Sequence, residues 1–173
     1  MSTRIDLSKL SLMDALDLAQ LIEIEANHRY LMFATQLGRG RGYDAGAFFV
    51  TMAENEAKHG RELEARRKAL FGDTPARLTL DDLFDIEAPE EGAPRRGMST
   101  IQAFEIALAA EKKAYDFYDM ALPGVTDPEI QALFTELRDE ETVHIEMLRE
   151  AMAKLPPSAS VVDEYDPDEA PYL

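Results

Sequence analysis

The sequence has no cysteine, no tryptophan and few basic residues for its acidic content. Without cysteine the chain can form no disulfide, thiolate zinc site or cysteine-ligated iron–sulfur centre, so a bound metal must be held by His, Asp and Glu. The 18 Lys and Arg against 34 Asp and Glu give a net charge of −16, which disfavours nucleic acid as a partner. No uncharged run approaches ~18 residues, and the N-terminus lacks the apolar centre of a signal peptide. We therefore expect a cytoplasmic protein that binds neither nucleic acid nor membrane.

The residues that are present predict one all-helical domain. A chain of 173 residues with 46% hydrophobic content can bury a single core without cross-links. Apolar residues recur at steps of three and four in four stretches, which predicts helices at about 12–37, 45–71, 100–122 and 128–155. Helix-start signals precede three of these stretches: Ser11 with Asp14, Ser99 with Gln102, and Asp127 before Pro128.

The connections predict how these helices are arranged. Short links at 38–43 and 122–127 make each pair an antiparallel hairpin, whereas residues 72–98 are long enough to run the length of a bundle. We therefore expect a four-helix bundle over residues 1–157, with a long crossover that contains a short helix near 78–86. Residues 158–173 form an acidic C-terminal tail, expected to be solvated or loosely docked.

The two predicted hairpins are similar in sequence. Residues 15–30 align with residues 103–118 at an offset of 88, which pairs Glu23 with Glu111. A Glu-x-x-His pattern at 56–59 aligns with another at 141–144 at an offset of 85. The chain is therefore an internal repeat of two helix pairs.

The repeat places charged residues on the otherwise apolar helix faces: Glu23, Glu56, His59, Glu111, Glu141 and His144. A Glu and a His three residues apart differ by about 300° around a helix and ~4.5 Å along it, so both can bind one metal. Four-helix di-iron and di-manganese carboxylate proteins use this ligand set. Two divalent cations would neutralise the four carboxylates. The alternative, buried polar residues without metal, is disfavoured because unpaired buried carboxylates cost several kcal/mol each.

Helix geometry turns Glu25 and His28 away from the Glu23 face, so we expect both on the solvent-facing or subunit surface. Glu54 and Glu140 are expected to flank the ligands without binding metal. Of these, Glu140 is the closest alternative to a ligand. Tyr30 and Tyr118 follow the first Glu of each half by two turns. Each is expected either to pack in the core or, as the weaker alternative, to donate a hydrogen bond to a ligand carboxylate.

Four segments resemble the rubrerythrin branch of the ferritin-like superfamily: EIEANHRYLMF (23–33), ENEAKHGREL (54–63), AAEKKAYDFY (109–118) and DEETVHIEML (139–148). The resemblance covers residues 12–155 and implies a ferritin-like bundle with a non-haem centre of two iron ions that reacts with hydrogen peroxide or oxygen. It implies a homodimer or larger homo-oligomer. The six Glu and His residues of the repeat match the ligands of that family.

Two departures from the family pattern bear on function. Rubrerythrins commonly carry a rubredoxin-like domain with four cysteines, and since this sequence has none, an external protein is expected to donate electrons. They also typically carry an additional Glu one turn after the third-helix ligand, where this sequence has Ala114. The remaining six-ligand set is closer to a ferroxidase site.

Three functions follow from the sequence. The first is a rubrerythrin-like oxidoreductase that reduces peroxide or oxygen with electrons from an external donor, as in a response to oxidative stress. The second is ferrous-iron oxidation for storage or detoxification, in which the acidic surface gathers cations. The third is a metal-binding interaction module without turnover. Imidazole and carboxylate ligands suit iron, with manganese or zinc as alternatives.

Overall fold

The computed structural model describes residues 10–37, 45–78 and 98–161 and shows four long helices. These are α1 (Leu12–Leu37), α2 (Ala45–Phe71), α4 (Thr100–Ala121) and α5 (Pro128–Met152). Two short 3₁₀ helices follow α4 and α5: η2 (Leu122–Gly124) and η3 (Pro157–Ser160). Over the described ranges there is no β-strand, so the predicted all-α class is confirmed.

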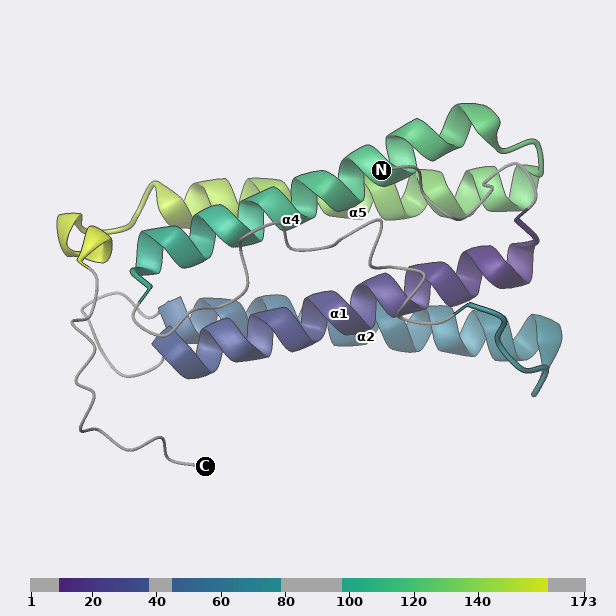
Figure 1. The fold of residues 1–173 in the computed structure, drawn as a ribbon, viewed down its shortest axis with the longest axis horizontal. Helices are drawn as coiled ribbons and strands as arrows, with labels where there is room; N and C mark the ends of the chain where they lie inside the picture. The colour runs from purple at the N-terminus through teal and green to yellow at the C-terminus, as the bar shows by residue number, and fades with distance from the viewer. Residues whose placement is uncertain (1–9, 38–44, 79–97, 162–173) are drawn as a thin grey trace.

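The long helices form two antiparallel pairs. Helix α1 packs along α2, and α4 packs along α5, with far fewer close backbone approaches between the pairs. Figure 1 shows the pairs as two layers whose long axes run in nearly the same direction. Since the two layers meet through side chains, the residues on their facing sides decide what the centre of the bundle contains.

Local signals at the helix starts act as the sequence predicts. Ser99 caps α4: its hydroxyl accepts a hydrogen bond from the Gln102 N–H, and the Gln102 side chain accepts one from the Ser99 N–H. The Asp127 carboxylate accepts bonds from two N–H groups in the first turn of α5. Before α1, Ser11 and Asp14 exchange reciprocal bonds of the same kind. These contacts satisfy N–H groups that have no partner within the helix.

Two helix ends differ from the sequence prediction. Helix α4 ends at Ala121, and residue 122 belongs to the 3₁₀ helix that contains Pro123. Helix α5 ends at Met152, three residues before the predicted end. Proline restricts the residue before it to extended conformations, so Pro156 prevents a helix that reaches 155. The predicted short helix at 78–86 lies outside the described residues except for Leu78, and most of the acidic tail also lies outside them.

Two apolar clusters divide the interior along the bundle axis. One contains buried residues from Ala15 to Ile22 of α1 and from Ile130 to Leu137 of α5. The other contains Tyr30 and Phe33 of α1, with Phe49, Phe104 and other residues near the opposite end of the bundle. Between these clusters, each long helix carries one of the Glu positions singled out from the sequence. The fold therefore places a polar layer between two apolar ones.

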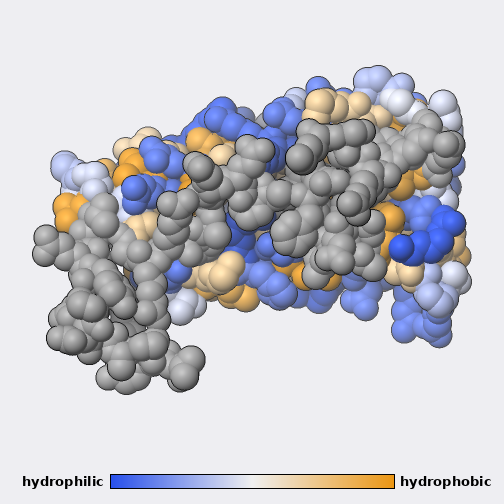
Figure 2. Space-filling model, viewed as in Figure 1, coloured by the Kyte–Doolittle hydropathy of each residue, from blue (hydrophilic) through white to orange (hydrophobic). Residues whose placement is uncertain are grey.

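The outer surface is mixed in character. Figure 2 shows hydrophilic and hydrophobic residues interspersed over the face that it presents. Within the described part of the chain, no helix combines the length and apolar content needed to span a membrane.

The cap of α4 provides a test of local stability. Replacement Ser99→Ala removes the hydroxyl that accepts from the Gln102 N–H, whereas the backbone N–H of residue 99 can still donate to the Gln102 side chain. Ser99 is buried, so the Gln102 N–H is left without this partner away from bulk water. We expect the free energy of unfolding to fall by about 1 kcal/mol, measured by urea denaturation. Ser158→Ala, at an exposed residue of η3, is the control and is expected to change stability by less than about 0.5 kcal/mol. Equal stability of the Ser99 variant and the parent would show that the cap contributes nothing.

Candidate metal centre

The structure brings the six residues of the repeat together in the polar layer. They come from all four long helices: Glu23 from α1, Glu56 and His59 from α2, Glu111 from α4, and Glu141 and His144 from α5. The four carboxylates and His144 are each less than 7% exposed, whereas His59 is only partly buried. Polar groups withdrawn from water to this degree need compensating partners.

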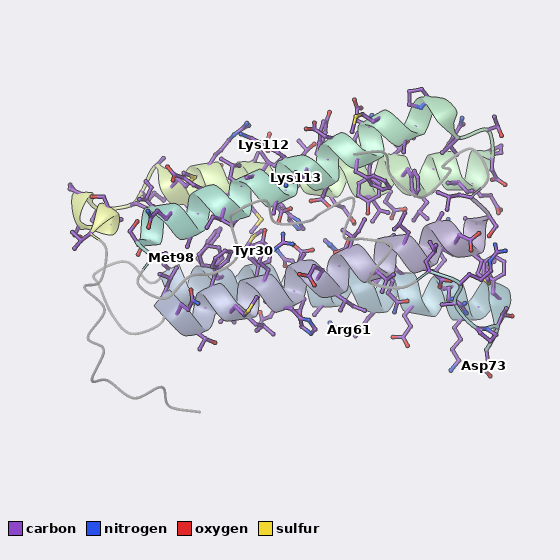
Figure 3. The ribbon with its side chains drawn as sticks, viewed as in Figure 1. Tyr30, Arg61, Asp73, Met98, Lys112 and Lys113 are labelled. Atoms are coloured by element: carbon purple, nitrogen blue, oxygen red, sulfur yellow. The ribbon has the colours of Figure 1, made fainter. Side chains whose placement is uncertain are left out.

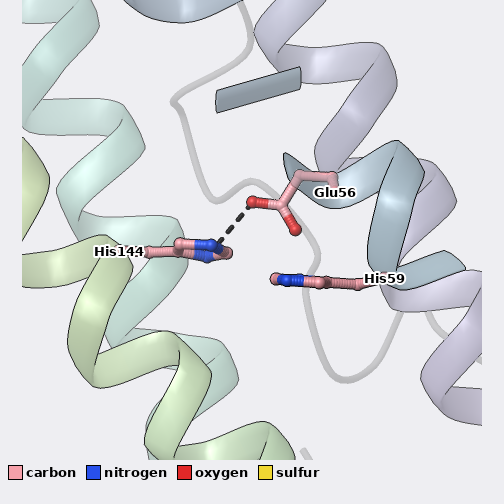
Figure 4. Close-up of side chains that lie close together, drawn as sticks. All are labelled: Glu56, His59 and His144. Atoms are coloured by element: carbon pink, nitrogen blue, oxygen red, sulfur yellow. Dashed lines mark ion pairs between the residues drawn. The ribbon is translucent and has the colours of Figure 1, made fainter. Parts of the chain in front are cut away.

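His144 lies at the centre of the more deeply buried group. Its Nδ1 is 3.2 Å from Oε1 of Glu56 and 3.3 Å from Oε2 of Glu111. The same nitrogen is 3.9 Å from Oε2 of Glu141, three residues earlier on α5. Figure 4 shows Glu56 reaching from α2 toward the His144 ring. One imidazole thus meets carboxylates from three helices.

His59 forms a second group toward the surface. Its Nδ1 is 3.7 Å from Oε2 of Glu23 and 3.8 Å from Oε2 of Glu140. The rings of His59 and His144 lie nearly parallel, with centroids 5.5 Å apart. The two groups are therefore adjacent, and Figure 4 shows Glu56 beside both rings.

The donor atoms lie close enough together to hold metal ions. Three sets each place one donor atom per residue within 4.8 Å of the others: Glu56, His59 and His144; Glu23, His59 and Glu140; and Glu111, Glu141 and His144. Oε2 of Glu23 and Nδ1 of both histidines are buried without a hydrogen bond in the described structure. Cations would satisfy these atoms, and a mixed nitrogen and oxygen donor set suits iron, manganese or zinc. The residues present therefore fit a metal centre.

Burial and mutual repulsion shift the proton affinities in this layer. Burial raises the pKa of Glu141 well above its usual value, and the nearby Glu111 carboxylate raises it further. Burial also raises the pKa of Glu140. The Glu23 carboxylate raises the pKa of His59 more than burial lowers it, although 3.7 Å is an ion-pair distance and too long for a hydrogen bond. Without cations, the layer therefore retains protons that metal binding must displace.

Most neighbouring residues lie as the sequence predicts. Glu54 and His28 are exposed, and the half-buried Glu25 lies 4.0 Å from the Arg29 guanidinium. Tyr30 lies between the helix pairs, where it stacks on Phe49 at 5.8 Å (Figure 3). The Tyr30 hydroxyl makes no hydrogen bond within the described structure. Tyr30 therefore packs in the core here, the first of the two alternatives.

Tyr118, the counterpart of Tyr30 in the second half, is also fully buried. Its ring packs against Phe134 at 5.4 Å and against Phe117 at 5.2 Å. These contacts place it in the apolar cluster that contains the N-terminal part of α1. The weaker alternative, a hydrogen bond from either tyrosine to a ligand, stays a prediction for the metal-loaded protein.

Two residues near the centre have positions that the sequence analysis missed. Glu140, expected only to flank the site, has its carboxylate in one of the three candidate sets. Its spacing of four residues before His144, which puts both on one side of α5, was the available signal. Arg29 is 7% exposed and lines a cavity of about 10 Å³ together with Glu23 and Ala114. Arg29 follows Ala26 by three residues and so lies on the buried stripe of α1. This spacing could have predicted its burial.

The pKa shifts predict how stability depends on pH when a chelator keeps the chain free of metal. Because the pKa of Glu141 is raised in the folded chain, its bound proton stabilises the fold fully below about pH 4.5, the ordinary pKa of glutamate. This stabilisation is lost as the pH rises through the higher pKa that Glu141 has in the folded chain. The raised pKa of His59 has the same effect, since its contribution to stability is lost as the pH rises above about 6.5, the ordinary pKa of histidine. We therefore expect the free energy of unfolding, from urea denaturation, to fall between about pH 5 and pH 8.

A pair of variants tests the origin of this slope. Glu141→Gln cannot titrate and is expected to flatten the pH dependence, whereas Glu54→Gln removes one exposed charge and is expected to keep it. Stability that stays constant or rises over this range in the parent chain would contradict the assignment of buried, proton-retaining carboxylates.

Comparisons with known proteins identify the family and the fold. The rubrerythrin family profile matches residues 14–152. An uncharacterized conserved protein from Magnetospirillum magnetotacticum has a similar solved structure, with 25% identity, a TM-score of 0.72, and coverage of 85% of this chain and 97% of that one.

A more distant structure shares the fold. It is a dodecameric thioferritin, the bacterioferritin-related protein from Bacteroides fragilis, with 18% identity, a TM-score of 0.63, and coverage of 87% of this chain and 88% of that one. The comparison with curated proteins finds no match. The assembly state of this chain stays a prediction. The family match spans most of the chain and includes all four long helices, so the expected ferritin-like fold is confirmed, and the chain belongs to the rubrerythrin family.

Proposed function

We propose that this protein is a di-iron oxidoreductase that reduces hydrogen peroxide, or oxygen, with electrons from a separate donor. The observation that carries the proposal is the convergence of four buried carboxylates and two imidazoles from both halves of the repeat. The proposed ligands are Glu23, Glu56, His59, Glu111, Glu141 and His144. When bound there, two ferrous ions would supply two electrons, become ferric, and allow hydrogen peroxide and two protons to form two water molecules.

The side chains would hold the reacting groups in place. Glu56 lies within reach of both histidines, which suits it to join the two metal positions. The apolar clusters at either end of the polar layer restrict access of bulk water. Low local polarity strengthens the attraction between carboxylates and cations. These features support a centre that keeps its metals close together and limits side reactions.

The surroundings of the carboxylates bear on the choice of oxidant. Ala114 is 2% exposed and lines the same small cavity as Glu23, Glu111 and Arg29. At this position the chain has a methyl group where rubrerythrins typically have an additional carboxylate. The absence of that carboxylate favours a second candidate, oxidation of ferrous iron as a substrate, as in ferritin-type ferroxidases.

A rapid-mixing experiment separates the two candidates. The chain is loaded anaerobically with two ferrous ions and mixed with hydrogen peroxide or with oxygen, and the absorbance of ferric iron is followed. We expect the peroxide reaction to be the faster by at least about tenfold, a difference of about 1.4 kcal/mol in activation free energy. Glu54→Gln is the matched control and is expected to react as the parent does.

Other results would change the assignment. Faster reaction with oxygen, followed by continued oxidation when iron is added beyond two ions per chain, would favour the ferroxidase candidate. Bound iron that reacts with neither oxidant would contradict both and would leave a metal-binding module without turnover.

A further inference from the structure

The two histidine groups differ in their access to solvent. Glu111, Glu141 and His144 are all buried, whereas His59 and Glu140 are only partly buried. A pocket of about 70 Å³ reaches His59 and Glu140 between α2 and α5. The deeper group does not line this pocket. The outer side of the centre therefore borders a pocket of about 70 Å³, whereas the cavity beside Glu111 and Glu141 measures only about 10 Å³.

Glu140 lies where this pocket meets the buried carboxylates. Its Oε2 is 3.8 Å from Nδ1 of His59, and Glu23 approaches the same nitrogen from α1 at 3.7 Å. The Glu23 side chain is 3% exposed, and its Oε2 has no hydrogen bond in the described structure. A cation among these three residues would give a close partner to a buried oxygen that has no hydrogen bond and only an ion pair with His59 at 3.7 Å.

The wall of the pocket is acidic. Glu62 and Glu136 line it in addition to Glu140, and Arg66 is the one Lys or Arg among the described lining residues. Arg66 lies 3.7 Å from Glu136, so part of its charge is already balanced. Glu62 likewise lies 3.7 Å from Lys58, so Glu140 is the pocket carboxylate for which no ion pair with Lys or Arg is described. Three carboxylates against two paired basic side chains leave the wall net negative, which favours cations over anions.

We propose that Glu140 is a seventh ligand of the centre and that this pocket is the route by which divalent cations enter and leave. The outer position, held by Glu23, His59 and Glu140, then exchanges its cation, while the inner position, held by Glu111, Glu141 and His144, retains it. This inference rests on the proposed metal centre. It adds Glu140, which the family resemblance did not assign as a ligand. It also makes the two metal positions different, although the two halves of the repeat are similar in sequence.

Manganese(II) under anaerobic conditions is a suitable probe because it binds oxygen and nitrogen ligands without being oxidised. Calorimetric titration of the parent chain is expected to show two ions with different affinities. Glu140→Gln keeps the size of the side chain but removes its charge, and it is expected to weaken only the lower-affinity ion by about tenfold or more. Electron paramagnetic resonance of the variant at one equivalent is expected to match that of the parent.

Glu54→Gln is the matched control, because Glu54 is exposed and has the same charge but does not line the pocket. It is expected to leave both affinities unchanged, within about twofold. A second variant, Glu62→Gln, tests the route alone: it is expected to slow the release of the weaker ion to a chelator without changing the spectrum of the bound manganese.

The outcomes separate this inference from the proposed function. Two ions bound by Glu140→Gln with the affinities of the parent would overturn the role of Glu140 while leaving the metal centre intact. Equal weakening of both ions would also overturn it, because the effect would then be general electrostatics. A parent chain that binds no manganese would overturn the inference together with the metal centre on which it rests. Thermal denaturation of each variant checks that it is folded.

Discussion

Four carboxylates buried between two apolar clusters impose the main constraint on this structure. Each of the four residues is less than 7% exposed, and their charges lie on facing sides of all four long helices. Such an arrangement is costly in water-free surroundings unless protons or cations compensate it. Protons account for part of the compensation, as the raised pKa of Glu141 indicates. Cations would do so more completely, and their binding free energy would then contribute to the stability of the bundle.

The charge balance also connects the two residues that the sequence analysis missed. With Glu140, five carboxylates surround the two histidines, and Arg29 lines the cavity on the side of Ala114. Two divalent cations would bring four positive charges to these five carboxylates, and the nearby Arg29 guanidinium, which also lies 4.0 Å from Glu25, adds positive charge to the surroundings. The repeat thus supplies a symmetric set of ligands, while Arg29 and Glu140 make its surroundings asymmetric. One side has a cavity of about 10 Å³ beside the Arg29 guanidinium, and the other has a pocket of about 70 Å³ with an acidic wall.

Sequence reasoning identified the bundle and the convergence of the six residues because both depend on helical periodicity. A Glu on an apolar stripe must face the core, and the repeat of Glu56 and His59 at Glu141 and His144 marks that placement as more than chance. It missed Glu140 because the comparison was made with Glu141, from which a neighbouring residue turns about 100° away, and not with His144, which lies one turn later on the same side of α5. The Tyr30 hydroxyl was ambiguous because its surroundings depend on the distance between helix pairs, which no local pattern encodes.

Metal stoichiometry tests most directly whether the buried layer is a binuclear centre. Chelator-treated chain is titrated anaerobically with ferrous ion, separated from free metal and analysed for bound iron. The arrangement of the ligands predicts two ions per chain, and Glu111→Ala, which removes a ligand of the inner group, is expected to lower this to one or fewer. Saturation of the parent chain at a single ion, or unchanged binding by the Glu111 variant, would contradict a centre in which both halves of the repeat hold metal.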